Sequence, residues 1–487
     1  MNALTAWICR APDSAPALLD LPGEFTGQAG RAVELTYGGL RRALSAAAAD
    51  IPTPPSGRAD APGTRAPAPL AIAAGSRIEL VMNVLLADWL GRPALPLPLD
   101  PVARAGFGLP AGPGIVIGTA RESVAANPGW ASHAVNWRQA LGGGIACGPV
   151  RGGASAWIVA TSGTSGRPRL AVLSGNAIAA SVAASVEALG LSRGDRWLLA
   201  LAPDRIAGLM VVARTLACAG ALRVDETWNA EAFASTVAAA RINRISVVPA
   251  MLAPLLEDAL PAGELATVLV GGAALTEPMA DRLRADGWPA WVSYGMTETC
   301  SHITLAPVDT HWRPGLAGRT VGNARVSAGA GPNQPEPIRV SGDMLMDGYL
   351  GEAPLAGDFQ TGDLGFTDAV GRLHITGRGD DVIVTGGVNV HPARVEAVLR
   401  SLRGVTDAAV GSLPDPRWGQ RLVAVIVGPV SDAALEAHCQ ARLPSAERPR
   451  DFLRAHSLPV AETGKLDRRA VSGMVRAHLQ ASSDREA

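Results

Sequence analysis

The segment 462–467, near the end of the chain, contains Lys465, the only lysine among 487 residues; the rest of the 43 lysines and arginines are arginine. A lysine offers a compact charge on a flexible stem, whereas arginine presents a wide planar fork. A compact charge suits a crowded site that neutralises a carboxylate or phosphate oxygen in a transition state. The alternative is a chance residue of an arginine-biased composition, and composition alone does not separate the two.

A loop rich in hydroxyls and glycines follows the apolar run 157–160. Glycines let the backbone approach a phosphate closely, and backbone amides in such a loop can form an anion nest. We therefore predict a phosphate-binding loop, although the GxxxxGK[ST] pattern of a Walker loop is missing. A flexible surface turn is the alternative. The residues expected to bind are Thr161, Ser162, Gly163, Thr164, Ser165, Gly166 and Arg169.

A second polar group, Tyr294 to Glu298, follows another apolar run. Tyr294 is one of three tyrosines and offers a flat face for a base. Thr297 can donate to a phosphate oxygen, and Glu298 can hold Mg²⁺ beside it. A strand-end turn with a capping Thr–Glu pair is the structural alternative.

Two shorter signals point to the same kind of site. Gly271 and Gly272 follow the strand-like run 267–270, and ligands settle at the carboxyl ends of parallel strands in open α/β sheets. Asp363 lies beside glycines, and an aspartate can accept both hydroxyls of a ribose. Taken alone, each is equally well or better explained as a tight turn.

Alternation of strand-like and helix-like segments predicts parallel sheet with crossover helices. Residues 51–69, rich in Pro, Gly and Ala, are expected to form an exposed loop. The expected strands before residue 311 are 70–74, 93–99, 114–118, 157–160, 197–202, 245–248 and 267–270. The expected helices there are one capped by Thr36, then 76–90, 175–190, 206–216 and 249–260.

Residues 311–377 have a different sequence pattern from the residues before them, because short strand-like pieces alternate with turns. These pieces are 338–341, 344–346, 366–368 and 372–376. The pattern predicts a small antiparallel β unit. A polar, glycine-rich stretch from 377 then suggests a linker or hinge. Beyond it the expected elements are helices at 393–402, 432–442 and 471–479 and strands at 405–412 and 422–427.

The predicted fold class is therefore α/β. It has a large N-terminal domain, residues 1–380, of parallel-rich layers with a small β-barrel-like unit, and then a small, mobile α+β domain, residues 381–487, that carries Lys465. With 48% hydrophobic and 18% charged residues the chain can bury a large core. A net charge of −1 argues against a dedicated nucleic-acid surface.

Scattered cysteines without a CxxC pair signal neither a zinc site nor a disulfide framework. The sequence shows no signal-peptide pattern and no apolar run approaching the roughly 20 residues of a membrane helix. We therefore expect a cytoplasmic protein. The sequence leaves the oligomeric state open, with a homodimer as one option.

Together and in this order, the motifs resemble the adenylate-forming superfamily, which includes acyl- and aryl-CoA ligases, adenylation domains of peptide synthetases and luciferases. The resemblance covers roughly residues 70–470. The matching segments are 161–169 (TSGTTGxPK), 294–298 (YGxTE), 361–363 (TGD), 377–392 (GRxxDxIxxGGxNIxP) and 462–465 (xTGK, with the family's catalytic lysine).

The resemblance implies two half-reactions. A carboxylate attacks the α-phosphorus of ATP to give an acyl-adenylate and pyrophosphate, and the thiol of coenzyme A then displaces AMP.

The resemblance also implies a role for each of the matching residues. Adenine would stack on Tyr294 beside Gly295 and Gly272, the ribose would bind Asp363 with Arg378, the phosphates would contact Thr161, Ser162, Thr164 and Thr297, and Mg²⁺ would bind Glu298. Lys465 would bridge carboxylate and phosphate, Asp381 would be the hinge, and Gly386 and Gly387 would face the pantetheine tunnel.

Within the superfamily, residues 293–301 resemble the o-succinylbenzoate–CoA ligases of menaquinone synthesis, and 199–208 resemble their PxxHxxG neighbourhood. The expected acid-binding residues are Arg205, Gly271 and Met296. The chain departs from the family where Arg169 replaces the loop lysine, Arg205 the histidine, and Arg394 the first glutamate of a Pro-x-Glu-Val-Glu motif that keeps Glu396. Arg205 opposite a second carboxylate would suit a dicarboxylate such as o-succinylbenzoate. The alternatives are another acyl- or aryl-CoA ligase, an enzyme that loads a carrier protein, or a non-catalytic binding relative.

We predict that Lys465→Ala lowers the rate of adenylation by about 10²–10³, the usual cost of losing one donor that stabilises transition-state charge. Transfer of coenzyme A to supplied acyl-adenylate should be spared, because the lysine acts in the first half-reaction only. Single-turnover pyrophosphate release and thioester formation measure the two steps separately. Adenylation at the wild-type rate would remove the role assigned to Lys465.

Overall fold

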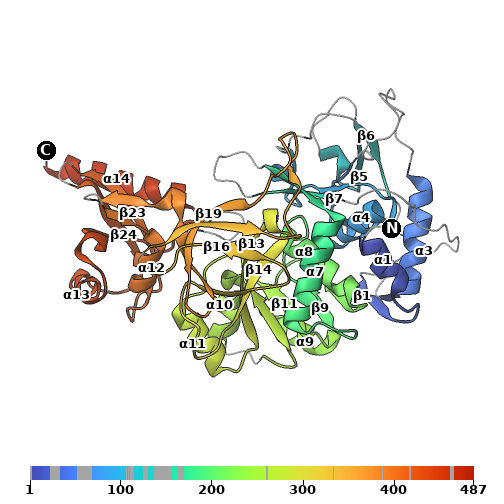
Figure 1. The fold of residues 1–487 in the computed structure, drawn as a ribbon, viewed down its shortest axis with the longest axis horizontal. Coiled ribbons are helices and arrows are strands. Elements are labelled where there is room, and N and C mark those ends of the chain that lie inside the picture. Colours follow the sequence, from blue (N-terminus) through green and yellow to red (C-terminus); the bar gives the residue numbers. More distant parts are fainter. Residues whose placement is uncertain are drawn as a thin grey trace.

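The chain was analysed as a computed structural model that describes residues 3–21, 33–51, 69–105, 107, 109, 114–123, 130–135, 156–161, 169–258, 262–332, 334–385, 388–415, 418–460 and 466–486. Most of the loop expected at 51–69 lies outside these residues. Elements from the two ends of the chain lie at opposite ends of the molecule (Figure 1). The N-terminal helices are α1 (Ala3–Arg10), α3 (Tyr37–Asp50) and α4 (Arg77–Trp89). The C-terminal helices are α12 (Pro392–Arg400), α13 (Asp432–Arg442) and α14 (Arg468–Glu486).

One sheet of the described residues is parallel at its centre and antiparallel at one edge. Its central strands β3 and β4 are buried at every position, as expected of short apolar strands covered on both faces. In spatial order its strands are β18 (Gly348–Tyr349), β8 (Leu170–Ser174), β7 (Ala156–Ala160), β4 (Ala94–Pro96), β3 (Leu70–Ile72), β5 (Gly114–Ile117) and β6 (Trp130–His133).

A second, larger sheet has a parallel half and an antiparallel half that meet at β13. The parallel half runs β1 (Pro16–Leu21), β10 (Ala221–Val224), β9 (Arg196–Leu199), β11 (Arg244–Val247), β12 (Thr267–Val270) and β13 (Ala290–Met296), with β2 (Val33–Thr36) antiparallel at its edge. The antiparallel half runs β14 (Ser301–Pro307), β15 (Leu316–Thr320), β20 (Leu373–Arg378), β19 (Phe359–Thr367), β17 (Glu336–Ser341) and β16 (Arg325–Ser327). Three of the four strands expected between residues 311 and 377, those at 338–341, 366–368 and 372–376, are therefore confirmed, and they are hydrogen-bonded to the large sheet through β14.

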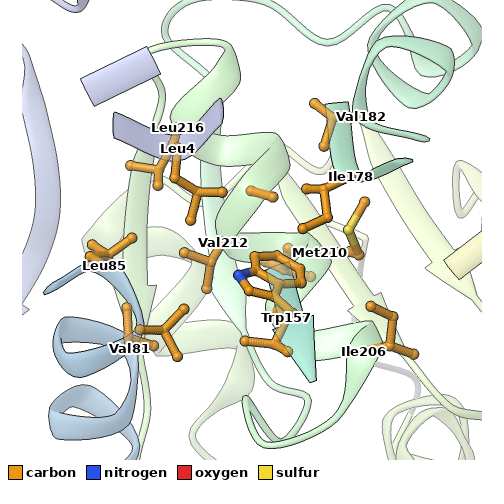
Figure 2. Close-up of a cluster of buried hydrophobic side chains, with 14 of the residues drawn as sticks. Leu4, Val81, Leu85, Trp157, Ile178, Val182, Ile206, Met210, Val212 and Leu216 are labelled. Carbon is orange, nitrogen blue, oxygen red and sulfur yellow. The ribbon is translucent and has the colours of Figure 1, made fainter. Parts of the chain in front are cut away.

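A layer of helices lies between the two sheets. Helix α7 (Gly175–Leu189) contacts β8 of the smaller sheet and β14 of the larger one, and α8 (Ile206–Ala217) packs on β9, β10 and α7. Trp157 on β7 is 2% exposed and lies among side chains of α4 and α8 (Figure 2). This buried layer fixes the strand ends from which the candidate site residues project.

Helix starts follow the capping residues that the sequence offers. Ser76 and Ser174 accept hydrogen bonds from backbone amides three residues on, which satisfies donors that the first turn leaves free. Thr36 does the same for α3 by accepting from the amide of Gly39 at 3.2 Å. On the outer face of the larger sheet, a separate hydrophobic cluster includes side chains of α9 (Phe233–Ala240), α10 (Pro249–Glu257) and α11 (Glu277–Ala285).

Residues after the expected hinge form their own small layers. The hairpin β21 (Ile383–Thr385) and β22 (Val388–Val390) precedes α12, and a sheet of β23 (Asp407–Asp415), β24 (Gly419–Val427) and β25 (Asp451–Arg454) follows. Helices α12 and α13 share a hydrophobic cluster on one side of this sheet, and α14 packs on the other through Val471 and Val475. Among the described helices, none combines the length and apolar character that crossing a bilayer requires.

The strand expected at 344–346 is wrong. Residues 342–345 form a turn, in which the amide of Leu345 donates to the carbonyl of Gly342, and Met344 and Met346 are both buried. Buried apolar residues at alternate positions imitate a strand, but here Gly342 has a φ of +143°, which strongly favours glycine, and the chain reverses there. The amide of Met346 instead donates to the carbonyl of Glu298 at 2.9 Å.

Candidate active site

Three residues expected near the adenosine are brought together. The hydroxyl of Tyr294, on β13, donates to a carboxylate oxygen of Asp363, on β19, at 2.8 Å. Arg378 lies opposite Asp363 in the register of β19 and β20, and its Nη1 is 3.4 Å from the other carboxylate oxygen. Burial, together with the nearby Asp363 carboxylate, holds the pKa of Tyr294 well above its usual value, so the phenol stays a neutral donor.

Glu298 belongs to a second chain of contacts. It lies in the short helix η2 (Thr297–Thr299), directly after β13, and accepts a hydrogen bond at 2.6 Å from the hydroxyl of Tyr349. The guanidinium of Arg169 lies over the Tyr349 ring, 3.3 Å from its centroid, and donates to both carboxylate oxygens of Glu352. Arg169 is thus held near the glutamate that was expected to bind a metal.

Tyr349 and Glu352 were missed in the sequence. The chain contains only three tyrosines, and the scarcity that drew attention to Tyr294 applies equally to Tyr349. Burial and the bond to Glu298 raise the pKa of Tyr349 above its usual value.

The glycines of the site are required by close packing. A Cβ on Gly271 would lie 2.5 Å from Oγ of Ser293 on the neighbouring strand, and a Cβ on Gly295 would lie 1.9 Å from the carbonyl oxygen of Ser301. Gly272 has a φ of +78° at the end of β12. Met296 ends β13, and its amide donates to Oγ1 of Thr299 at 3.0 Å.

A buried network of side chains around Arg214 lies next to Ser301 and His302, and it was not predicted from the sequence. Arg214 on α8, fully buried, donates to Oγ of Ser185 and of Ser301, each at 3.1 Å, and lies 3.1 Å from Nδ1 of His302. Burial is the main reason that the pKa of Arg214 falls to about 9 and that of His302 well below its usual value. The network holds Ser301 at a φ of +92°, a region that non-glycine residues rarely adopt.

The predicted phosphate loop is described only at its ends. Thr161 is 7% exposed, and its amide donates to the carbonyl of Arg169 at 2.8 Å, so the loop joins the antiparallel strands β7 and β8. The remaining site residues expected from the sequence lie outside the described residues. They are Ser162, Gly163, Thr164, Ser165, Gly166, Gly386, Gly387 and Lys465.

Arg205 lies apart from the Tyr294 and Glu298 groups, at the start of α8. Its nearest charged partner is Asp204, at 3.8 Å, whose side chain is 10% exposed. One carboxylate oxygen of Asp204 is buried without a hydrogen-bond partner. Burial raises the pKa of Asp204, although Arg205 opposes that shift. The contact joins Nε of Arg205 to Oδ2 of Asp204, and the Arg205 side chain is 36% exposed.

Glu298 suits a magnesium ion that is held by one carboxylate together with a bound nucleotide. The described residues contain no group of three or more histidine, cysteine or acidic side chains able to hold a metal. Magnesium in nucleotide sites is usually held by one or two carboxylates and the substrate phosphates, rather than by a cage of protein ligands. A single glutamate at the end of β13 meets that requirement when a nucleotide is bound.

A separate cavity of about 220 Å³ lies in the C-terminal region. Thr385 and Val388, which flank Gly386 and Gly387 in sequence, line it. The rest of its lining is rich in arginine and includes an indole: Trp418, Arg421, Leu422, Ser445, Ala446, Arg448 and Arg450. The Arg450 guanidinium is 5.9 Å from the centroid of the Trp418 ring. The cavity therefore offers arginine side chains and an aromatic face.

The sequence of this chain matches two protein-family models and is similar to several named enzymes. The model of the AMP-binding enzyme family matches residues 122–350, and that of the AMP-binding enzyme C-terminal domain matches residues 394–465. The chain is 30% identical over 323 residues to a 2-succinylbenzoate–CoA ligase of Lactococcus lactis, covering 65% of this chain and 70% of that protein. It is 31% identical over 341 residues to that of Bacillus velezensis, covering 67% and 70%. It is 33% identical over 322 residues to that of Staphylococcus aureus strain bovine RF122, covering 64% and 65%.

Solved structures share the fold over nearly the whole chain. The Bacillus subtilis o-succinylbenzoate CoA synthetase (MenE), in complex with the acyl-adenylate intermediate OSB-AMP, superposes with a TM-score of 0.77 at 24% identity, covering 97% of this chain and 98% of that one. ATP-bound MatB from Rhodopseudomonas palustris superposes with a TM-score of 0.81 at 23% identity, covering 97% and 99%.

The fold and the site define an adenylate-forming enzyme, and the chain belongs to the family of AMP-binding enzymes. Its activity class is that of an ATP-dependent, AMP-forming carboxylate–CoA ligase, as the sequence resemblance implied.

The buried Asp204 yields a prediction about pH. Its ionised form is disfavoured in the folded protein, so the charge costs stability in full above the raised pKa, and the cost falls away between that pKa and the lower pKa of the unfolded state. We expect Asp204→Asn to raise the midpoint of thermal unfolding at pH 8 by about 2 °C or more. The difference from wild type should shrink as the pH falls and Asp204 becomes protonated.

Differential scanning calorimetry between pH 5 and pH 8 measures this difference. The exposed Glu264→Gln serves as a control that removes a carboxylate without relieving burial. A lower unfolding midpoint for Asp204→Asn at pH 8 would contradict the prediction and show that the charge itself is stabilising.

Proposed function

We propose that the chain is a 2-succinylbenzoate–CoA ligase that acts in menaquinone biosynthesis. In the first step an oxygen of the substrate carboxylate attacks the α-phosphorus of ATP and pyrophosphate leaves. In the second the thiol of coenzyme A, losing its proton, attacks the acyl carbonyl and AMP leaves. The observation that carries the proposal is the Tyr294–Asp363–Arg378 cluster beside Glu298, combined with the three relatives described above, which are named for this activity.

The adenosine is proposed to bind the cluster of Tyr294, Asp363 and Arg378. The Tyr294 ring would support the adenine, beside the close-packed Gly295 and Gly272. Asp363 is 9% exposed and already accepts from two donors, so its oxygens are held in place before a ribose arrives. A carboxylate positioned in this way loses little entropy on binding, which strengthens its hydrogen bonds to ribose hydroxyls.

The triphosphate is proposed to lie between the loop 161–169 and the turn at Thr297. Residues Thr161, Ser162, Gly163, Thr164, Ser165 and Gly166 would supply donors, with Arg169 at the end of the loop. When bound, Mg²⁺ would lie at Glu298 and offset phosphate charge. Attack of one anion on another needs fixed cations more than an acid or a base, and Lys465 is proposed to supply the mobile one.

The acid is proposed to bind near Gly271, Met296 and Arg205. Reaction consumes one carboxylate of 2-succinylbenzoate and leaves the other unreacted. Arg205, whose acidic neighbour among the described residues is the buried Asp204 at 3.8 Å, can pair with that second carboxylate. Arginine presents a planar fork that matches a carboxylate in two hydrogen bonds.

Coenzyme A is proposed to enter beside Gly386 and Gly387, with its phosphate-rich end in the arginine-lined cavity. The Trp418 ring can stack on a base there, and Arg421, Arg448 and Arg450 can offset phosphate charge. We further propose that residues 1–380 and 381–487 act as two domains with a hinge at Asp381. The separate hydrophobic clusters after residue 382 support this division.

Two alternative functions compete with this proposal. Another acyl- or aryl-CoA ligase activity, or loading of a carrier protein, would use the same nucleotide site with a different acid pocket or a different thiol.

A cytoplasmic location and a homodimer stay predictions. Cell fractionation tests the location, and light scattering tests the homodimer. Nucleic acid is not expected as a partner, given the net charge of −1.

Pyrophosphate release from a panel of carboxylic acids tests the function. We expect release with ATP, Mg²⁺ and 2-succinylbenzoate, and thioester formation once coenzyme A is added. Benzoic and fatty acids should be at least about tenfold poorer substrates, because they leave Arg205 without its partner. Release only with fatty or benzoic acids would favour a generic ligase, and no release with any acid would favour a binding protein.

Arg205→Ala tests the acid pocket. We expect KM for 2-succinylbenzoate to rise about 10- to 100-fold, the usual loss for a hydrogen-bonded charge pair, while KM for ATP changes little. Steady-state kinetics of both substrates give the two constants. Arg223→Ala, which removes an arginine on β10 that is paired with Asp20 and Asp225, is the control. An unchanged KM for the acid in Arg205→Ala would remove Arg205 from the pocket.

A further inference from the structure

A short segment, residues 346–352, connects the end of the predicted phosphate loop to the turn that carries Glu298. Strand β18 in this segment pairs with β8, and the amide of Leu350 donates to the carbonyl of Leu170 at 2.8 Å. Strand β8 begins at Leu170, the residue after Arg169. The segment is therefore attached to the smaller sheet at the point where the loop ends.

The same segment holds Glu298 by its backbone and by its side chain. The amide of Met346 donates to the carbonyl of Glu298 at 2.9 Å, and the hydroxyl of Tyr349 donates to Oε1 of the Glu298 carboxylate at 2.6 Å. Tyr349 belongs to the smaller sheet, whereas Glu298 directly follows β13 of the larger sheet. The hydrogen bond between these side chains therefore joins the two sheets where the triphosphate is proposed to bind.

The ring of Tyr349 is held from the side of the loop. The Arg169 guanidinium lies 3.3 Å from the ring centroid, which is within the range of a cation–π interaction. Nε and Nη2 of Arg169 donate to Oε1 and Oε2 of Glu352, at 3.2 Å and 2.7 Å. Both partners are about half exposed, so the ion pair adds little to stability. Its geometry instead keeps the guanidinium over the ring.

The Glu298 carboxylate has one oxygen that is held and one that can bind a ligand. Glu298 is partly exposed, so it is accessible from solvent. In the part of the chain that the structure describes, Oε1 accepts from Tyr349 and no hydrogen bond reaches Oε2. Carboxylates that ligate metals are usually oriented by such a partner, and losing it typically costs about 10- to 100-fold in metal affinity or activity.

We propose that Tyr349 is a positioning residue that orients Glu298 toward Mg²⁺ and attaches the metal site to Arg169, where the predicted phosphate loop ends. The proposal rests on one part of the function proposed above, the binding of Mg²⁺ at Glu298 together with ATP. The Tyr349 hydroxyl holds Oε1 and leaves Oε2 to the metal. The Arg169 guanidinium, held by Glu352, keeps the ring in place, so this arginine acts on the site through Tyr349.

Calorimetric titration of ATP into the full-length chain, with excess Mg²⁺ and separately with EDTA, tests this role. No carboxylic acid is present, so ATP is bound and not consumed. We expect Tyr349→Phe, which keeps the ring beneath Arg169 and removes only the hydroxyl, to weaken binding of Mg·ATP about tenfold. Binding of ATP in EDTA should stay within about twofold of wild type, because the hydroxyl acts only through the metal ligand.

Tyr37→Phe is the matched control. The Tyr37 hydroxyl, on α3, is buried and donates to the carbonyl of Gly220 at 2.9 Å, and α3 carries none of the site residues. Its removal costs stability, since a buried carbonyl loses a donor. Both ATP dissociation constants should nevertheless stay within about twofold of wild type, which is the result expected of a tyrosine hydroxyl that only supports the fold.

The double variant Glu298→Gln/Tyr349→Phe should bind Mg·ATP no more weakly than Glu298→Gln alone, since both residues act through one carboxylate. Wild-type binding by Tyr349→Phe, equal weakening with and without the metal, or additive losses in the double variant would overturn the proposal. A wild-type chain that binds Mg·ATP as expected but releases no pyrophosphate with 2-succinylbenzoate would instead overturn the proposed function and not this role.

Discussion

The hydrogen bond from Tyr294 to Asp363 connects the two halves of the large sheet. Tyr294 lies near the end of β13, the last parallel strand, and Asp363 lies in an antiparallel strand beyond β14, β15 and β20. Neither half alone offers both an aromatic face and a ribose acceptor. The proposed nucleotide site therefore depends on the change from parallel to antiparallel pairing at β13.

Several features of this arrangement could be predicted from the sequence. Thr36 was expected to cap a helix and does so, and apolar strands followed by glycines marked the ends of β7 and β12. The order of the motifs identified the family and placed Tyr294, Asp363 and Arg378 in one site, which the structure brings together. The reason is local: each motif follows a strand whose apolar character is unambiguous.

Other features depend on contacts between distant segments and left no local signal. Tyr349 reaches Glu298 across 51 residues, and Glu352 reaches Arg169 across 183. Arg214 is a helix residue whose partners lie on another helix and on β14, so its burial could not be inferred from a helical pattern. The turn at Gly342 imitated a strand because both methionines are buried. The residues that support the site, rather than those that form it, were therefore the ones missed.

The arginine-rich composition has a consequence for the chemistry of acyl-adenylates. A mixed anhydride that escapes its site acylates amines, and guanidinium groups, being always protonated, are poor nucleophiles. In this chain every basic residue but one is an arginine or a histidine, so the side chains present a single primary amine. An enzyme built in this way offers its own reactive intermediate few amines to acylate, and its single side-chain amine is the one on which formation of that intermediate is proposed to depend.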